Sequence, residues 1–142
     1  MYSVKAVKSF ESPDGGGFNC TLLEDGKPVA QCHDSGDGGD VDFRWLDKTA
    51  EARLEQYCAA LPKTDPDEYG MELTWDPGFF VSDLVARYLD DKRFERMSRT
   101  KYLFRVEGDP AGEWRTIKRC PEALLQITRR YGDAVVIWEP AC

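Results

Sequence analysis

The chain has 142 residues, of which 42% are hydrophobic and 32% charged, and its formal net charge at neutral pH is −7. This composition is typical of a folded globular protein and excludes a disordered one. No stretch approaches the roughly 18 apolar residues that cross a bilayer, and the N-terminus lacks the apolar core of a secretory signal, so we expect a cytoplasmic protein with no membrane partner.

The first third of the chain predicts an antiparallel meander of four strands. Apolar and polar residues alternate with the period of two that half-buried strands require. The alternating segments lie at residues 4–10, 18–22, 29–32 and 41–45. Between the second and third segments, Asp25-Gly26 supplies the positive φ angles of a tight hairpin turn.

Two helices are predicted in the centre of the chain. The first covers residues 48–61 and buries an apolar stripe that includes Tyr57, with Asp47 as its N-cap. The second begins with a proline after the cap residue Asp76 and extends to about residue 99. The connection between the two helices, residues 63–76, is also rich in acidic residues.

The last third of the chain predicts a strand–strand–helix–strand unit. Residues 102–106 and 114–119 form a hairpin, and the following helix turns Leu124, Ile127 and Tyr131 inward and stops at Gly132. Residues 134–138 are apolar on both faces, which predicts a central strand. The fold class is therefore α+β, and its length is that of one domain spanning residues 1–142.

Charge is distributed unevenly along this domain. Residues 1–91 carry 19 acidic and 8 basic residues, a balance of −11, whereas residues 92–142 carry 7 acidic and 11 basic residues, a balance of +4. Charge asymmetry of this kind bears on the choice of partner more than on the fold.

The acidic residues gather in two loops. Closely spaced carboxylates on loops can take the place of phosphates in the basic groove of a partner protein. We therefore interpret these loops as a protein-binding surface, and the alternative is an ordinary solvated surface. The candidate partner-binding residues are Asp34, Asp37, Asp40, Asp42, Asp65, Asp67 and Glu68.

The first of these loops also raises the question of a metal. Acidic residues interleaved with glycine can surround a hard cation such as calcium, and such a site would allow a metal-dependent hydrolase. The spacing does not match an EF-hand loop, however, and turn chemistry explains the glycines without an ion. We therefore predict neither a metal nor a cofactor.

The basic residues support a second function, the binding of nucleic acid. Positive charge interleaved with the aromatic residues Tyr102, Phe104 and Trp114 suits single-stranded nucleic acid, because phosphates meet charge and bases stack on rings. Internal pairing of these charges is the alternative. The candidate residues are Lys92, Arg93, Arg96, Arg99, Arg115, Lys118 and Arg119.

No catalytic motif is present, and we expect a protein that is not an enzyme. The only histidine, His33, follows Cys32, and strand neighbours point to opposite faces, so they do not form a nucleophile–base pair. The five cysteines lack a CxxC spacing, which favours free, buried thiols. Cys20 and Cys32 flank the Asp25-Gly26 turn and could approach each other across the hairpin.

Three segments carry a resemblance to known proteins. The segments Val4–Gly15, Gly17–Leu22 and Tyr131–Asp133 resemble short, uncharacterised proteins encoded by bacteriophages and prophages. The resemblance implies an accessory protein of a mobile element, acting in the bacterial cytoplasm on a host protein or nucleoprotein complex. Inhibition of a bacterial defence system such as CRISPR is among the functions that it implies.

Overall fold

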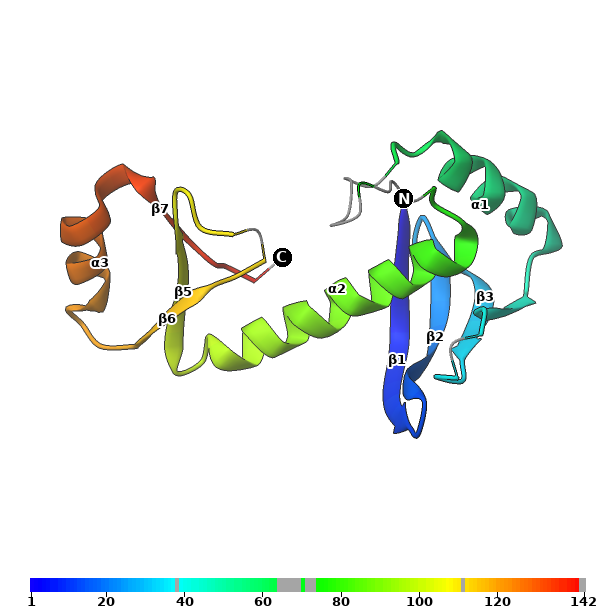
Figure 1. Ribbon diagram of the computed structural model, residues 1–142, viewed down its shortest axis with the longest axis horizontal. Helices are drawn as coiled ribbons and strands as arrows, with labels where there is room; N and C mark the ends of the chain where they lie inside the picture. Colours follow the sequence, from blue (N-terminus) through cyan, green and yellow to red (C-terminus); the bar gives the residue numbers. More distant parts are fainter. Residues whose placement is uncertain (38, 64–69, 71–73, 111, 141–142) are drawn as a thin grey trace. The chain divides into compact units, whose positions relative to one another are not determined.

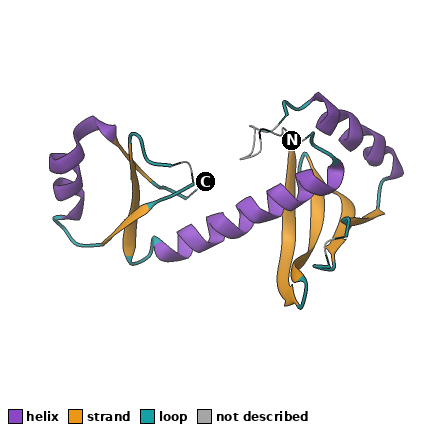
Figure 2. Cartoon of the chain, in the orientation of Figure 1, coloured by secondary structure: helices purple, strands orange, loops and turns teal. Residues whose placement is uncertain are grey.

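The computed structural model describes the whole chain except residues 38, 64–69, 71–73, 111 and 141–142 (Figure 1). Its first strands and helices are β1 (Tyr2–Ser12), β2 (Gly15–Glu24), β3 (Lys27–Asp34), β4 (Asp42–Trp45), α1 (Lys48–Ala60) and α2 (Pro77–Met97). They are followed by β5 (Lys101–Val106), β6 (Arg115–Lys118), α3 (Ala123–Tyr131), the 3-10 helix η1 (Gly132–Ala134) and β7 (Val135–Ile137) (Figure 2). The predicted α+β class is confirmed, including the meander, the two central helices and the C-terminal β-β-α-β unit.

The chain divides into two compact units, residues 1–88 and residues 89–142. The boundary falls inside α2, whose last residues belong to the second unit. The assignment of residues 1–142 to a single domain stays a prediction, and the unfolding experiment in the Discussion tests it.

The first unit contains a four-stranded antiparallel sheet with the order β1-β2-β3-β4. The β2–β3 turn has positive φ angles at Asp25 (50°) and Gly26 (82°), which confirms the predicted hairpin. Residue 17, close to the β1–β2 turn, has to be glycine, because a Cβ there would clash with the Asp34 carbonyl oxygen.

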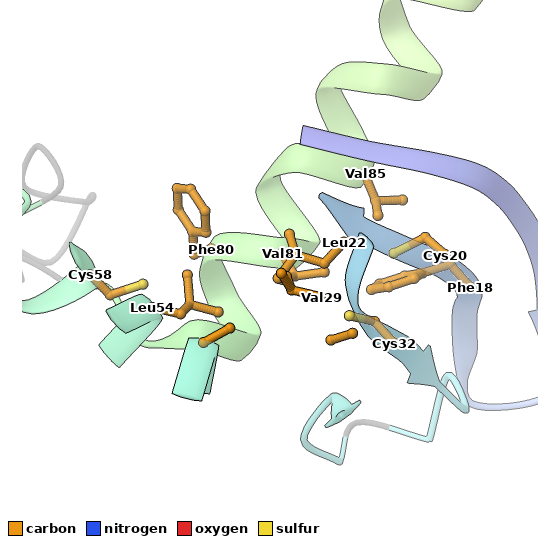
Figure 3. Close-up of a cluster of buried hydrophobic side chains, with 12 residues drawn as sticks. Phe18, Cys20, Leu22, Val29, Cys32, Leu54, Cys58, Phe80, Val81 and Val85 are labelled. Carbon is orange, nitrogen blue, oxygen red and sulfur yellow. The ribbon is translucent and has the colours of Figure 1, made fainter. Parts of the chain in front are cut away.

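One face of this sheet packs against α1 and the beginning of α2 to form the core of the first unit (Figure 3). The buried residues are Phe18, Cys20, Leu22, Val29, Ala30, Cys32, Ala50, Leu54, Cys58, Phe80, Val81 and Val85. Tyr57, expected in the buried stripe of α1, is exposed instead. Its ring covers the rim of the core, edge-on to Tyr2 and Phe80.

Both predicted helix caps are present. Asp47 Oδ1 accepts a hydrogen bond from the Thr49 N–H at 3.0 Å, and Asp76 Oδ1 accepts one from the Phe79 N–H at 2.8 Å. Each carboxylate satisfies a backbone donor that the first helical turn leaves without a partner.

The second unit contains a three-stranded sheet with the order β6-β5-β7. The prediction of a central strand at residues 134–138 is wrong, because in the described part of the chain β7 pairs with β5 alone and lies at the edge of the sheet, where Val136 is 61% exposed. The helix α3 ends at Gly132 (φ 61°) and buries Ile127, both as expected, but it also buries Ala123 and leaves Leu124 42% exposed.

A polar network ties the first strands to α1. The Tyr2 hydroxyl donates to Glu24 Oε2 at 2.8 Å, and the Arg53 guanidinium donates to both Glu24 carboxylate oxygens. Burial, followed by the hydrogen bond to Glu24, raises the pKa of Tyr2 to about 12. Hydrogen bonds from Arg53 lower the pKa of Glu24.

We expect the protein to lose stability as the pH rises from 10 to about 12. In this range Tyr2 ionises in the unfolded chain but keeps its proton in the folded protein, so rising pH favours unfolding; below pH 10 both states are protonated and the contribution is complete. Urea unfolding across this range should show a shallower decline for Tyr2→Phe than for the unmodified protein. Parallel pH profiles of the two proteins would contradict this assignment.

Candidate functional site

The connection between β3 and β4 forms an exposed acidic loop, defined here as residues 34–42. Asp34 is the last residue of β3 and Asp42 the first of β4, with Asp37 and Asp40 between them. Asp34 is half-buried and the other three are exposed. The hairpin therefore brings four of the seven predicted partner-binding residues to one end of the sheet, whereas Asp65, Asp67 and Glu68 lie outside the described residues.

The acidic loop is attached to the neighbouring β1–β2 turn. Ser12 Oγ lies within hydrogen-bonding distance of the Gly36 carbonyl oxygen (2.9 Å) and the Gly15 carbonyl oxygen (2.8 Å). The Gly36 N–H donates to Asp34 Oδ1 at 2.9 Å. Glycine is needed at this position, because its φ is 79° and a Cβ would meet Ser12 Oγ at 2.9 Å.

The charge of the acidic loop is not neutralised by cations within the described chain. None of its four carboxylates forms an ion pair with a lysine or arginine among the described residues. The Gly39 N–H, which donates to Asp37 Oδ1, and the Ser35 hydroxyl lower the pKa of Asp37. Asp37 is therefore ionised at neutral pH.

The geometry gives no support for a metal site. Among the residues that the structure describes, no three histidine, cysteine, aspartate or glutamate side chains gather closely enough to hold a metal ion. A metal-dependent hydrolase at the acidic loop consequently has no ligand set in the described part of that loop.

His33 lies on the exposed face of the sheet. Its Nδ1 is hydrogen-bonded to Asn19 Oδ1, and its ring stacks on Phe10 with the centroids 6.1 Å apart. The neighbouring Cys32 is buried on the opposite face. The two side chains point apart, as the strand period predicts, and do not form a catalytic pair.

The predicted nucleic-acid-binding residues all belong to the second unit. Lys92, Arg93 and Arg96 lie on the last turns of α2 and Arg99 just beyond it. The remaining three lie on or directly after β6 and are Arg115, Lys118 and Arg119. The structure thus brings these residues into one compact unit.

Most of these cations have intramolecular partners. Arg115 makes two hydrogen bonds to the Asp109 carboxylate, at 3.0 and 2.8 Å, and they lower the pKa of Asp109. Arg93 pairs with Asp90 at 3.5 Å, and the Arg119 guanidinium lies 4.1 Å from the Tyr102 ring centroid. Within the described ranges, three of the seven make no ion pair and no aromatic contact: Arg96, Arg99 and Lys118.

A cavity of about 400 Å³ in the second unit was not foreseen from the sequence. Arg105 lines this cavity, and its guanidinium lies 5.6 Å from the Trp114 ring centroid. The buried Nε of Arg105 has no hydrogen-bond partner among the described residues. Glu107, Asp133 and Val136 also line it. The lining comes from four separate segments, so no local spacing in the sequence could indicate this cavity.

Comparison with known proteins gives no match. No family model, no curated protein and no solved structure matches the chain. Over the described residues, none of the helices combines the length and the apolar character needed to cross a membrane.

Proposed function

We propose that this protein is a non-enzymatic binding protein whose acidic loop engages a basic surface on a partner protein. The observation that carries the proposal is that the four carboxylates of the acidic loop have no lysine or arginine partner among the described residues. Hydrogen bonds hold this loop against the neighbouring turn. Their charge is available to another molecule.

Two physical effects favour binding through the acidic loop. Exposed charges of one sign attract a partner of opposite sign and accelerate its association. The contacts from Ser12 and Gly36 hold the loop before binding, which reduces the ordering cost that a free loop would bear. The surrounding unit strengthens the field, because residues 1–88 carry 17 acidic and 8 basic residues, a balance of −9.

The resemblance to phage and prophage proteins supports a host protein or nucleoprotein complex as the partner. A host complex that handles nucleic acid exposes basic grooves, and a set of fixed carboxylates is complementary to such a groove. We therefore place the proposed partner in the bacterial cytoplasm, with a defence system such as CRISPR as one candidate.

The test has two steps. Tagged protein is first used to capture a partner from a bacterial lysate, and the partner is then purified. The variant Asp37→Lys/Asp40→Lys/Asp42→Lys should bind this partner at least about 100-fold more weakly than the unmodified protein, because three favourable charge contacts become repulsive. Affinity is measured by biolayer interferometry at low and physiological salt.

A matched control variant distinguishes the effect of the acidic loop on binding from the effect of the protein's overall charge. Glu51→Lys/Glu55→Lys/Asp91→Lys makes the same change in net charge at exposed positions outside the loop, and it should retain most of the affinity. Thermal unfolding confirms that both variants fold. Equal loss of binding in the two triple variants, or unchanged binding of the loop variant, would refute a role for the acidic loop.

Nucleic-acid binding by the second unit is the alternative function. The structure supports this alternative less well than binding through the acidic loop, because most of the candidate cations already have a partner. Within the described structure, those without an ion-pair or aromatic partner are Arg96, Arg99 and Lys118. Fluorescence titration with single-stranded and duplex oligonucleotides at two salt concentrations measures it directly. Salt-dependent binding that Arg96→Glu/Arg99→Glu/Lys118→Glu removes would favour this alternative.

A further inference from the structure

Two buried cysteines face each other inside the first unit. Cys20 on β2 and Cys32 on β3 are direct register partners in the antiparallel sheet, and each is only 3% exposed. Both side chains point into the core cluster (Figure 3). Opposed residues on neighbouring strands point to the same face, so the two thiols meet without any rearrangement of the backbone.

This placement satisfies the geometric requirement for a disulfide. Directly opposed residues of an antiparallel pair have Cα atoms about 4.5–5.5 Å apart, within the range of about 4.4–6.8 Å that a disulfide bridges. The pairs on either side, Thr21 with Gln31 and Asn19 with His33, are in the same register as the two cysteines. The register shift of this hairpin, between Leu22 and Leu23, lies closer to the turn and sets Cys20 opposite Cys32.

The two thiols are also chemically unequal. A hydrogen bond from the Cys32 thiol lowers the pKa of Cys20, and the same interaction, together with burial, raises the pKa of Cys32. Cys58, buried in the same core, has a pKa raised to about 11 by burial. Cys20 is therefore the thiol of this core that ionises first, which is the property of an attacking sulfur.

We propose that Cys20 and Cys32 are a reversible redox site, a dithiol that a small disulfide such as oxidised glutathione converts into a cross-strand disulfide. The Cys20 thiolate attacks one sulfur of the oxidant, which forms a mixed disulfide and releases one glutathione thiolate. Cys32, deprotonated in turn, attacks the Cys20 sulfur and releases the second. Two cysteine thiols are oxidised, one oxidant disulfide is reduced, and two protons pass to the departing thiolates.

Burial sets the rate of this reaction. The sulfurs face the side of the sheet that the helices cover, so glutathione reaches them only when the core of the first unit opens locally. Oxidation is consequently slow in the folded protein and accelerates under conditions that promote opening. Once formed, the disulfide joins β2 to β3 two residues before Asp34, at the base of the acidic loop.

The experiment uses the full chain with Cys120→Ser and Cys142→Ser, which removes the exposed Cys120 and the terminal cysteine. The folded protein is incubated with oxidised glutathione, unreacted thiols are alkylated in denaturant, and the intact mass is recorded. We expect the oxidised species to carry two fewer alkyl groups than the reduced protein, because two of its thiols have formed the disulfide. Peptide mapping should link Cys20 to Cys32, and dithiothreitol should reverse the change.

Two measurements control the interpretation. Cys58→Ser removes the third buried thiol and should leave the linkage intact, whereas Cys32→Ser should prevent it. Oxidation should raise the thermal midpoint by about 5–10 °C, because the crosslink restricts the unfolded chain. The proposal is overturned if the folded protein forms no Cys20–Cys32 linkage after incubation, or if the linkage involves Cys58.

Discussion

Replacing Leu54 with alanine should lower the free energy of unfolding by about 2–5 kcal/mol. Leu54 is 0% exposed and lies on α1 in the core cluster of the first unit. Its truncation removes buried apolar surface and leaves a cavity next to the sheet, which the packed neighbours fill only in part. Urea unfolding followed by far-ultraviolet circular dichroism measures the change.

The neighbouring residue provides the control for Leu54. Glu55 is exposed on the same helix, so Glu55→Ala should change the free energy of unfolding by less than about 0.5 kcal/mol. A loss below about 1 kcal/mol for Leu54→Ala would show that α1 does not pack on the sheet as described.

Leu103→Ala should lower the free energy of unfolding of the second unit by a similar amount, about 2–5 kcal/mol. Leu103 is 1% exposed and lies on β5, the central strand of the three-stranded sheet. Lys101→Ala, at an exposed position of the same strand, is its control. If Leu103→Ala lowered the free energy of unfolding no more than Lys101→Ala, the burial of Leu103 on β5 would be contradicted.

The two core variants also test the domain assignment, because tryptophans report on each unit separately. Trp45→Phe/Trp75→Phe leaves fluorescent reporters only in residues 89–142, and Trp114→Phe/Trp138→Phe leaves them only in residues 1–88. The prediction of one domain requires that both reporters unfold in a single transition and that Leu54→Ala shifts both. A shift confined to the first unit would show that the two units unfold independently.

The features that could be predicted from the sequence are those with local causes. Alternation along a strand, the Asp25-Gly26 turn and the carboxylate caps at Asp47 and Asp76 each depend on residues within a few positions of one another. The meander, the hairpin, both caps and the stop of α3 at Gly132 were accordingly predicted. The exposed, turn-rich character of the acidic loop follows from the same local chemistry.

The incorrect predictions concern burial and strand order. Residues 134–138 are apolar on both faces, yet β7 is an edge strand, because a sheet of three strands has only one central position and β5 occupies it. Leu124 and Tyr57 fit helical stripes, but both side chains are exposed, and Ala123 is buried next to Leu124. Cys120, expected to be buried, is exposed because it lies in the connection before α3.

The sequence by itself determined where the strands, turns and helices lie and where charge collects along the chain. Only the tertiary structure decided which charges are neutralised. Arg115 forms an ion pair with Asp109, whereas the carboxylates of the acidic loop form none with a lysine or arginine in the described residues. It also decided that Cys20 and Cys32, which flank the predicted turn, are direct partners, because a register shift between Leu22 and Leu23 sets that pairing. The physical reason is the same in both cases, since pairing in space depends on strand register and packing between segments that local spacing does not encode.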